Sequence, residues 1–371
     1  MRIMKLFIGF LLLLLFSACE SHQLKSGEKV AQTDKKNEKE AVKEKTEHEL
    51  QSLQPIEINS QSFQTISAWF DEASVLYINN DEHGSEVIRH NLESGSDTIF
   101  YQTNDPIVQL AENPDRTIFL LHSTSSSRQA ALMFVDKNGN ELFRWEIPAF
   151  DLQYIWNPYH QSELFVTAFA EDWSYTSYIV DAKEQKVVKS PYQIPFIQWS
   201  GKQRFTYIHW NNDEPELSAP LYEVDLQNKK VEKLAEHAIG NGNMSSFIMY
   251  LEEDQDNKGF GRYVFLRSSS KQKVFTKRAP LASDNAQWVF PFYGYDKTKH
   301  FVYVFIPNKP METGLFKLIQ INPLSGRETP ILSNVSNYPI KLSPSGRYAL
   351  YGPRLENLID VKKRKVFSII Q

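Results

Sequence analysis

The sequence contains few residue patterns that could carry out catalysis. An α/β-type hydrolase needs a nucleophilic Ser in a G-x-S-x-G turn, and the chain has no such motif. A zinc peptidase needs H-E-x-x-H, but His48-Glu49 has no second His at that spacing. The nine His residues are scattered, and a single Cys cannot build a zinc site from several thiolates. Because distant residues can meet in a folded chain, a site assembled from separate segments stays open.

One acidic segment resembles the beginning of a calcium-binding loop. Asp254, Asp256 and Gly259 stand at the first, third and sixth positions of an EF-hand loop. Lys258 at the fifth position and Phe265 at the twelfth are unsuitable as calcium ligands. We therefore predict no metal here and interpret the segment as a solvated acidic turn.

The single Cys follows a segment typical of a secretory signal. A short positive stretch precedes an apolar run from Leu6 to Phe16, which is shorter than the roughly 20 residues of a spanning helix. The run leads into Phe16-Ser17-Ala18-Cys19, which resembles a bacterial lipobox except that Phe16 stands where Leu is usual. The resemblance implies that residues 1–18 are removed and that a diacylglycerol on Cys19 holds the chain at the extracytoplasmic face of the cell membrane. An ordinary signal peptide with a chance Cys is the alternative.

The next segment, residues 19–57, is predicted to be a charged, flexible tether. Lys and Glu crowd together between residues 35 and 49, and no aromatic residue occurs in the tether. Such a segment buries too little apolar surface to offset the entropy of ordering it. A partly helical stalk is the alternative, because opposite charges recur four residues apart.

The overall charge excludes one class of partner. The chain of 371 residues has a net charge of −4, and removal of residues 1–18 makes it −6. A strongly basic surface for nucleic acid is therefore not expected. Nothing in the sequence indicates a cofactor.

From residue 58 to residue 371 the pattern indicates one all-β domain built from repeats. Short runs of β-branched and aromatic residues alternate with turns. One recurring unit is a hairpin around a polar turn such as Lys137-Asn138-Gly139-Asn140. The other is a turn containing Pro or Gly before an apolar strand, as in Ser343-Pro344-Ser345-Gly346 and Asn113-Pro114-Asp115-Arg116. These turns look like the S-P-D-G repeat of TolB-type propellers.

The two units alternate, which predicts a β-propeller of four-stranded blades. Seven repeats of roughly 45 residues fit the domain, as expected for blades. The fifth repeat, around Phe247 to Leu251, lacks a clear strand, so six blades is the alternative count. A pair of β-sandwiches is the alternative fold. The last strand, from Lys365 to Ile370, is predicted to close the ring, with Val366, Phe367, Ile369 and Ile370 buried.

Aromatic residues are the remaining candidates for a binding site. In this scheme the innermost strands carry Trp69, Trp156, Trp199 and Trp288. Exposed at the mouth of the central channel, they would stack on sugar rings or hold a peptide. The alternative is that they pack between blades. Trp173 and Tyr175 form a similar but weaker case.

The lipobox, the tether and the repeats together resemble uncharacterised lipoproteins with a YqgU-like β-propeller. The resemblance implies six blades, whereas the repeats favour seven, and it brings no catalytic motif. We predict a membrane-anchored, non-enzymatic module that binds a protein or a cell-envelope polymer. A channel-site hydrolase, lactonase-like or glycan-acting, and a structural subunit of an envelope assembly are the alternatives.

Overall fold

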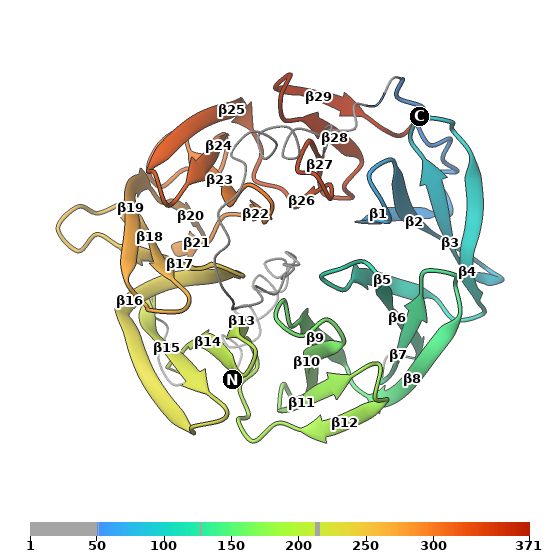
Figure 1. Ribbon diagram of the computed structural model, residues 1–371, viewed down its shortest axis with the longest axis horizontal. Coiled ribbons are helices and arrows are strands. Elements are labelled where there is room, and N and C mark those ends of the chain that lie inside the picture. Colours follow the sequence, from blue (N-terminus) through green and yellow to red (C-terminus); the bar gives the residue numbers. More distant parts are fainter. Residues whose placement is uncertain (1–49, 51, 127, 212–215) are drawn as a thin grey trace, which may run out of the picture.

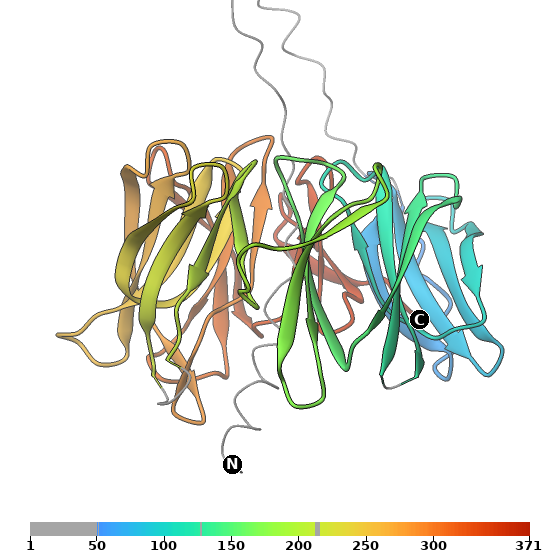
Figure 2. The ribbon, with the colours of Figure 1, turned by 90° about the horizontal axis from the view of Figure 1, so that it is seen from below.

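Short antiparallel sheets stand side by side around a central axis in the computed structural model (Figure 1). The structure describes residues 50, 52–126, 128–211 and 216–371. Over these ranges the chain forms strands, turns and loops without a helix, so the all-β prediction is confirmed. Seen from the side, the strands run roughly along the axis of the ring (Figure 2). The predicted signal peptide, Cys19 and the tether up to residue 49 lie outside the described residues.

Each sheet is a meander in which every strand pairs with the next strand along the chain. Five sheets have four strands each. The first sheet contains β1 (Phe63–Trp69), β2 (Ser74–Asp81), β3 (Gly84–Asn91) and β4 (Asp97–Thr103). The second contains β5 (Ile107–Glu112), β6 (Ile118–Ser126), β7 (Gln129–Asp136) and β8 (Glu141–Pro148). The third contains β9 (Asp151–Trp156), β10 (Glu163–Phe169), β11 (Tyr175–Asp181) and β12 (Lys186–Lys189). Near the end of the chain, one sheet contains β22 (Tyr293–Asp296), β23 (Phe301–Pro307), β24 (Phe316–Asn322) and β25 (Arg327–Val335). The last sheet contains β26 (Ile340–Leu342), β27 (Tyr348–Tyr351), β28 (Asn357–Asp360) and β29 (Lys365–Ser368).

A further sheet has seven strands because β16 pairs with different strands along its two halves. This sheet contains β13 (Gln198–Gly201), β14 (Arg204–Ile208), β15 (Ala219–Asp225), β16 (Lys230–Met244), β17 (Phe247–Glu253), β18 (Phe260–Arg267) and β19 (Lys273–Pro280). The first half of β16 pairs with β15 up to Ala238, and the second half pairs with β17 from Ala238 to Met244. The first half is mostly exposed and the second is mostly buried. A small hairpin, β20 (Ala282–Asp284) and β21 (Gln287–Val289), follows this sheet.

Two glycines explain why the second half of β16 is hard to see in the sequence. A Cβ atom at Gly240 would overlap the Phe290 ring, and one at Gly242 would overlap the Tyr293 ring. Only glycine therefore lets this half of the strand lie so close to the next part of the ring. A strand does precede Phe247, namely the second half of β16, but it continues directly from the first half without a turn between them.

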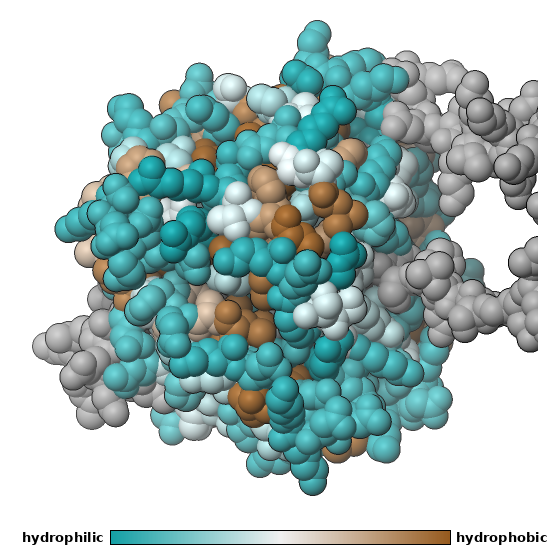
Figure 3. Space-filling view, turned by 60° about the vertical axis from the view of Figure 1, so that its left-hand side comes forward, coloured by the Kyte–Doolittle hydropathy of each residue, from teal (hydrophilic) through white to brown (hydrophobic). Residues whose placement is uncertain are grey.

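The apolar side chains are buried between neighbouring sheets. Along β7, Leu132 and Phe134 pack toward the sheet that begins with β9, whereas Met133 and Val135 pack toward the first sheet. Each sheet therefore buries side chains on both faces, which accounts for apolar strands without a clear alternation. The outside of the ring is mostly hydrophilic on the side seen in Figure 3, with apolar side chains in small groups.

The first and last sheets meet, and the two ends of the described chain close the ring there. The Ile56 N–H donates to the Ile369 carbonyl at 2.8 Å, and the Gln371 N–H donates to the Ile56 carbonyl at 3.0 Å. Leu50 donates its N–H to the Tyr348 hydroxyl at 3.0 Å. Leu50, Ile56 and Ile369 belong to one apolar cluster with side chains of both sheets. We call this junction the seam.

The seam corrects two sequence predictions. Leu50, Leu53 and Ile56 pack on the ring, although the sequence analysis assigns them to the tether, because they are apolar anchors in a polar segment. Val366 and Phe367 are each 40% exposed on the outer strand, so the prediction that they are buried is wrong. Ile369 is fully buried, as predicted.

His90 holds the same segment to the first sheet. Its Nδ1 atom lies 2.7 Å from Oδ1 of Asp97, and its Nε2 atom lies 2.9 Å from the carbonyl oxygen of Gln54. The imidazole is almost completely buried. The residues before β1 are therefore joined to the ring by both polar and apolar contacts.

The seam generates a prediction about stability. Ile369→Ala removes buried methyl groups from the junction and should cost about 2–5 kcal/mol of unfolding free energy. The matched control Val366→Ala, on the exposed outer strand, should change it by about 0.5 kcal/mol or less. Urea denaturation of both variants measures the difference. Equal destabilisation of the two would contradict the assignment of the seam.

A second buried imidazole lies between the second and third sheets. His122 on β6 packs edge-on against Tyr154 on β9, with ring centroids 5.9 Å apart. Burial lowers the pKa of His122 to about 4. The folded protein therefore keeps this ring neutral at pH values where the unfolded chain protonates it.

This imidazole makes stability depend on pH. Between about pH 6.5 and pH 4 the unfolded chain binds a proton at His122 that the folded chain does not bind, so stability falls as the pH falls. Between pH 7.5 and pH 5 protonation of this site should lower the unfolding free energy of the wild type by about 2 kcal/mol. His122→Phe has no titrating group at this position, so this part of the loss should be absent from the variant. Urea denaturation at the two pH values tests this. A variant with the same acid sensitivity as the wild type would refute it.

Candidate functional site

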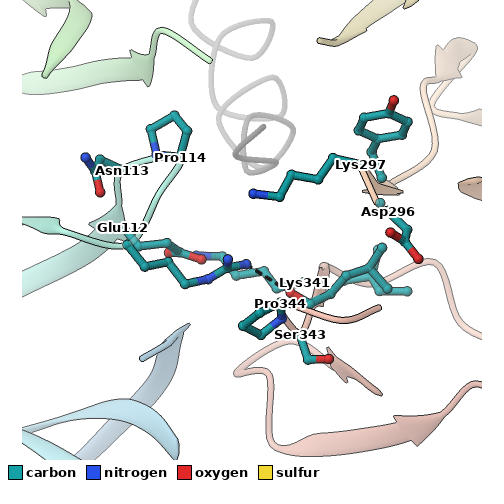
Figure 4. A pocket seen from close by; sticks show the side chains of 13 residues that line it. Glu112, Asn113, Pro114, Asp296, Lys297, Lys341, Ser343 and Pro344 are labelled. Atoms are coloured by element: carbon teal, nitrogen blue, oxygen red, sulfur yellow. Dashed lines mark hydrogen bonds and ion pairs between the residues drawn. The ribbon is translucent and has the colours of Figure 1, made fainter. Parts of the chain in front are cut away.

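A pocket lies in the centre of the ring, where β5, β22 and β26 finish and turn into the next strands (Figure 4). These strands come from three different sheets. The charged side chains among its lining residues are Glu112, Arg116, Asp296, Lys297 and Lys341. The pocket is therefore polar and highly charged, unlike the apolar spaces between sheets.

Two of the turns that line the pocket have the same structure. In the turn after β5, the Asn113 side-chain oxygen accepts the Thr117 N–H at 2.8 Å, and the Arg116 N–H donates to the Asn113 carbonyl at 3.0 Å. In the turn after β26, the Gly346 N–H donates to the Ser343 carbonyl at 2.9 Å. The sequence analysis grouped these two turns as copies of one repeat, and their hydrogen bonds agree with that grouping.

Arg116 occupies a position that favours glycine. Its φ is +56°, and the equivalent Gly346 has φ +69°. A residue with a Cβ atom pays about 1–2 kcal/mol for this left-handed conformation. Its half-buried guanidinium lies beside Leu342, whose carbonyl accepts a long hydrogen bond of 3.5 Å from Nη2. Burial lowers the pKa of Arg116, and nearby Glu112 opposes this, so the group stays cationic.

Lys341 joins three sheets at the pocket. Its ammonium donates to Glu112 at 2.9 Å and to the Ser67 carbonyl at 2.6 Å. The lysine and glutamate side chains are 12% and 6% exposed, so this ion pair is largely shielded from water. The Trp69 indole N–H donates to the Lys341 carbonyl at 2.9 Å and fixes the backbone of the same residue. Such a pair holds a definite geometry, because separating its charges in a buried site is costly.

The rim of the pocket is also held by carboxylates. Glu72, in the turn after β1, accepts the Ser345 N–H at 2.8 Å and the Ser343 hydroxyl at 2.9 Å. Asp296 accepts the N–H groups of Thr298 and Lys299 within its own turn, at 2.9 and 3.1 Å. These contacts make the walls of the pocket rigid.

Asp296 also packs tightly against the neighbouring turn. A Cβ atom at Gly346 would overlap the Asp296 carboxylate, so this position needs glycine both for its φ and for the close approach. The Lys297 side chain, by contrast, extends toward the middle of the pocket (Figure 4). The pocket lining therefore combines three cations with two carboxylates.

The tryptophans predicted to line the channel mouth have another role. Trp69, Trp156 and Trp199 are at most 5% exposed. Each indole N–H donates to a carbonyl on the innermost strand of the preceding sheet in the ring: Trp69 to Lys341, Trp156 to Ala111 at 3.4 Å, and Trp199 to Ile155 at 3.2 Å. Packing between sheets buries the ring and still satisfies its N–H group. The expected exposed stacking surface is therefore not formed by these three residues, and the alternative interpretation describes them correctly.

Trp288 and the second aromatic group lie elsewhere. Trp288 is half-buried on β21 and packs against the apolar cluster of the neighbouring sheets. Trp173 contacts Phe150 and Phe169 edge-on, and Tyr175 also packs against Phe169. Phe150 and Tyr175 are 48% and 39% exposed, near the start of β9 rather than its pocket end. The structure brings none of these side chains into the pocket.

The acidic segment is a turn held by internal contacts. Asp254 is buried and lies 3.3 Å from Nε of Arg278. Within the described ranges, no group of three or more His, Cys, Asp or Glu is arranged to hold a metal ion. The same part of the chain contains no helix long and apolar enough to cross a membrane.

The sequence analysis missed the charged residues of the pocket. Glu112 ends β5 and Lys341 is the middle residue of β26, each just before a recognisable turn, but the turn pattern itself does not include them. Arg116 did carry a signal, because it replaces the glycine of a recognisable turn. A cationic residue at a position that favours glycine is the pattern that could have identified it.

Comparison with known proteins identifies a relative of this chain and solved structures with a similar fold. The curated relative "Uncharacterized lipoprotein YqgU" of Bacillus subtilis (strain 168) is 27% identical over 360 residues, which cover 97% of this chain and 94% of that protein. The crystal structure of the uncharacterized protein lmo1340 from Listeria monocytogenes EGD-e has a TM-score of 0.78 at 21% identity, covering 86% of this chain and 98% of that chain. An oligogalacturonate lyase from Vibrio parahaemolyticus has a TM-score of 0.54 at 11% identity, covering 82% of this chain and 88% of that chain, a likeness of fold alone.

The family comparison covers most of the ring. The model of the YqgU-like 6-bladed beta propeller domain matches residues 91–352, from the end of β3 to just after β27. The matched segment therefore includes the turns after β5, β22 and β26 that form the pocket. The family resemblance expected from the sequence is confirmed, and the chain belongs to the family of YqgU-like 6-bladed β-propeller domains.

Proposed function

We propose that this protein is a lipoprotein, anchored through Cys19 at the extracytoplasmic face of the membrane, whose ring binds a ligand without chemical conversion. The observation that carries this proposal is the central pocket, where charged side chains from three sheets are fixed in place. A rigid arrangement of charges recognises a ligand at little entropic cost. The ligand belongs to a protein or to a polymer of the cell envelope.

The contacts of the pocket favour binding over catalysis. A general base needs an oxygen or nitrogen within reach of a substrate proton, and a nucleophile needs such a base beside it. Glu112 is engaged with Lys341, and Asp296 is engaged with its own turn. Among the described residues that line the pocket there is no His or Cys.

A channel-site hydrolase, lactonase-like or glycan-acting, is the alternative. Its support is fold likeness, since structures of similar fold include oligogalacturonate lyases, one of them described in complex with manganese. At 11% identity this likeness transfers no chemistry. The described part of the chain also has no cluster of metal ligands.

Attachment to the membrane rests on the N-terminal sequence and on a relative. The segment Phe16-Ser17-Ala18-Cys19 resembles a lipobox, and the Bacillus subtilis relative is described as a lipoprotein. A diacylglycerol supplies two acyl chains, which give stable attachment where one chain would be marginal. Leu50, the first described residue, lies within the predicted tether, and the part of the tether before it would hold the ring away from the lipid.

We also propose that the ring has seven blades, although the family is described as six-bladed. The two halves of β16 serve as the outer strand of one blade and the innermost strand of the next. The seven-stranded sheet then counts as two blades, beside five sheets of four strands. An experimental structure in which β16 runs straight within a single sheet would contradict this count.

Membrane attachment predicts a clear effect of one substitution. Wild-type protein should sediment with membranes, whereas Cys19→Ser should be released or keep its signal peptide, because no diacylglycerol can be attached. Cell fractionation with N-terminal sequencing measures both results. Equal retention of a normally processed variant would refute the anchor.

Ligand binding at the pocket predicts where a crosslink forms in intact cells. A photoreactive residue in place of Pro344, which lines the pocket, should give a covalent adduct on irradiation. The same residue in place of Val188, 46% exposed on the outer strand β12, should not. Mass spectrometry of the purified protein identifies the adducts. Equal labelling at both positions, or labelling at neither, would contradict the proposal.

A further inference from the structure

We propose that the end of the ring that holds the pocket faces the lipid surface and is drawn to anionic head groups by its positive charge. The inference concerns an outer surface of the ring and not the ligand of the pocket. It rests on the proposed lipid anchor and goes beyond it, because it fixes which way the anchored ring is turned.

The ring has two ends, at which the strands turn into one another (Figure 2). Because the strands of each sheet alternate in direction, the turns after the first and third strands share one end. The turns after β5, β22 and β26 form the pocket there, and the Val361 N–H, after β28, donates to the Arg347 carbonyl of the turn after β26 at 3.2 Å. We call this the pocket end. The turns after the second strands, such as β6 and β10, lie at the far end.

The two ends differ in charge. Counting the turns within sheets, each with the strand residue on either side, the pocket end carries 19 Lys and Arg residues against 14 Asp and Glu residues. The far end carries 4 against 10, with residues 212–215 left aside. The net charge of −4 therefore hides a separation of charge along the axis of the ring.

The length of the strands keeps the two charged ends apart. A strand of seven residues is roughly 20 Å long, whereas charges act over about 8 Å through physiological salt. A flat anionic surface beneath one end would therefore interact mainly with that end. The pocket end is the one that such a surface attracts.

Much of the positive charge lies in one turn, between β28 and β29. Lys362, Lys363 and Arg364 form this turn with Val361, and Lys365 is the first residue of β29. All four cationic residues are exposed. Lys363 lies 3.8 Å from the Asp360 carboxylate, whereas the other three side chains have no hydrogen bond or ion pair with any described residue. We call residues 362–365 the basic turn.

The conformation of Arg364 shows that the turn itself does not need this charge. Arg364 has φ +56°, and its N–H donates to the Asp360 carbonyl at 2.7 Å. Gly95 and Gly326, with φ +71° and +69°, occupy corresponding turns of other sheets, and each donates to the carbonyl four residues earlier at 2.9 Å. Glycine adopts this conformation more easily than arginine. The cation at position 364 is therefore not explained by the fold of the turn.

The chain that would be anchored enters the ring at the pocket end. The bridge between Ile56 and Ile370 is parallel, so the residues before Ile56 run back along β29 toward its beginning, where the basic turn lies. The Gln54 N–H accordingly donates to the carbonyl of Leu92, in the pocket-end turn after β3, at 2.8 Å. A lipid on Cys19 would thus hold the ring from the side of its positive end.

The length and charge of the tether allow this approach. Residues 20–49 contain seven Lys residues against eight Asp and Glu residues, so their own charges nearly balance. A flexible chain of this length spans about 30 Å on average and at most about 100 Å. The basic turn therefore stays close to the lipid, where each Lys or Arg adds to the attraction of an anionic surface. A polymer of the envelope lacks this enforced proximity, so the observations favour lipid.

The test measures which end of the anchored ring lies nearer the lipid. The lipid-modified protein is placed in vesicles of phosphatidylglycerol and phosphatidylcholine, and in vesicles of phosphatidylcholine alone. A fluorescent label on an introduced cysteine transfers energy to an acceptor on the lipid head groups. Ser94→Cys places the label in an exposed turn at the pocket end, and Ser174→Cys places it in an exposed turn at the far end. Cys19, the only native cysteine, is blocked by its lipid.

The expected result is a difference between the two labels that depends on lipid charge. In anionic vesicles, transfer from position 94 should exceed transfer from position 174 by about twofold or more. The difference should shrink in phosphatidylcholine alone and at high salt, because the attraction is electrostatic. Equal transfer in anionic vesicles, greater transfer from position 174, or a difference that ignores lipid charge would overturn the inference.

Variants of the basic turn test the residues that are held responsible. Lys362→Gln, Arg364→Gly and Lys365→Gln together should reduce the difference in anionic vesicles to about the value in phosphatidylcholine. An unchanged difference would overturn the inference. If this triple variant lowers Tm, Arg364→Gly alone decides the question, because glycine relieves the backbone strain there. A smaller difference than in the wild type then supports the inference, and no change overturns it.

The matched control removes three exposed cations from the far end. Arg128→Gln, Lys189→Gln and Lys258→Gln change the net charge by about the same amount as the triple variant of the basic turn. This control should keep the full difference between the labels. An equal loss in both triple variants would overturn the inference, because it would reduce the effect to net charge.

An anionic polymer is the competing occupant of the pocket end, with polyphosphate as the probe. Equal transfer from both labels in anionic vesicles, together with binding of polyphosphate that the triple variant of the basic turn loses, would assign this end to a polymer and overturn the inference.

The same samples separate this inference from the proposed function. Protein that does not stay with the vesicles refutes the lipid anchor, and this inference falls with it. Protein that stays but shows no preferred end refutes this inference alone. Ligand binding at the pocket is decided independently, by the crosslink at position 344 in cells.

Discussion

Closure of the ring is the constraint on which the rest of this structure depends. Every sheet has two apolar faces, as β7 shows with Leu132 on one side and Met133 on the other. No sheet can bury both faces unless it has a neighbour on each side, so the first and last sheets must meet. The chain achieves this through backbone hydrogen bonds of Ile56 with Ile369 and Gln371, and through one shared apolar cluster.

The central pocket depends on the same closure. Lys341 belongs to the last sheet, but its ammonium binds the Ser67 carbonyl of the first sheet and the Glu112 carboxylate of the second. Trp69 fixes the Lys341 backbone across the same junction. Charged residues more than 200 positions apart in the chain thus meet at the pocket, as the Lys341–Glu112 hydrogen bond illustrates. A ring that failed to close would lose the pocket along with the core.

The sequence predicts the fold better than the site, for physical reasons. Turns such as the one at Gly139, with φ +84°, have local signals, because few residues adopt that conformation. The inner half of β16 escapes detection because Gly240 and Gly242 suggest a turn, whereas they allow close packing against rings far along the chain. Trp69, Trp156 and Trp199 lie on innermost strands as predicted, whereas Trp288 lies in the small hairpin of β20 and β21. A sequence pattern does not tell a ring that packs between sheets from one that faces a channel. The Glu112–Lys341 pair cannot be read from the turns beside the two residues, since only closure of the ring brings them together.

The way the chain enters the ring has a mechanical consequence. The residues before Leu50 lead directly into the segment that bonds to Ile369 and Gln371. A pulling force applied through the N-terminal part of the chain would therefore act first on the seam, and not on the hairpin ladders inside a sheet. The bridge between Ile56 and Ile370 is parallel, so strand-parallel tension would load its hydrogen bonds in shear and share the force among them. The junction that closes the ring is thus also the point at which an external load would enter it.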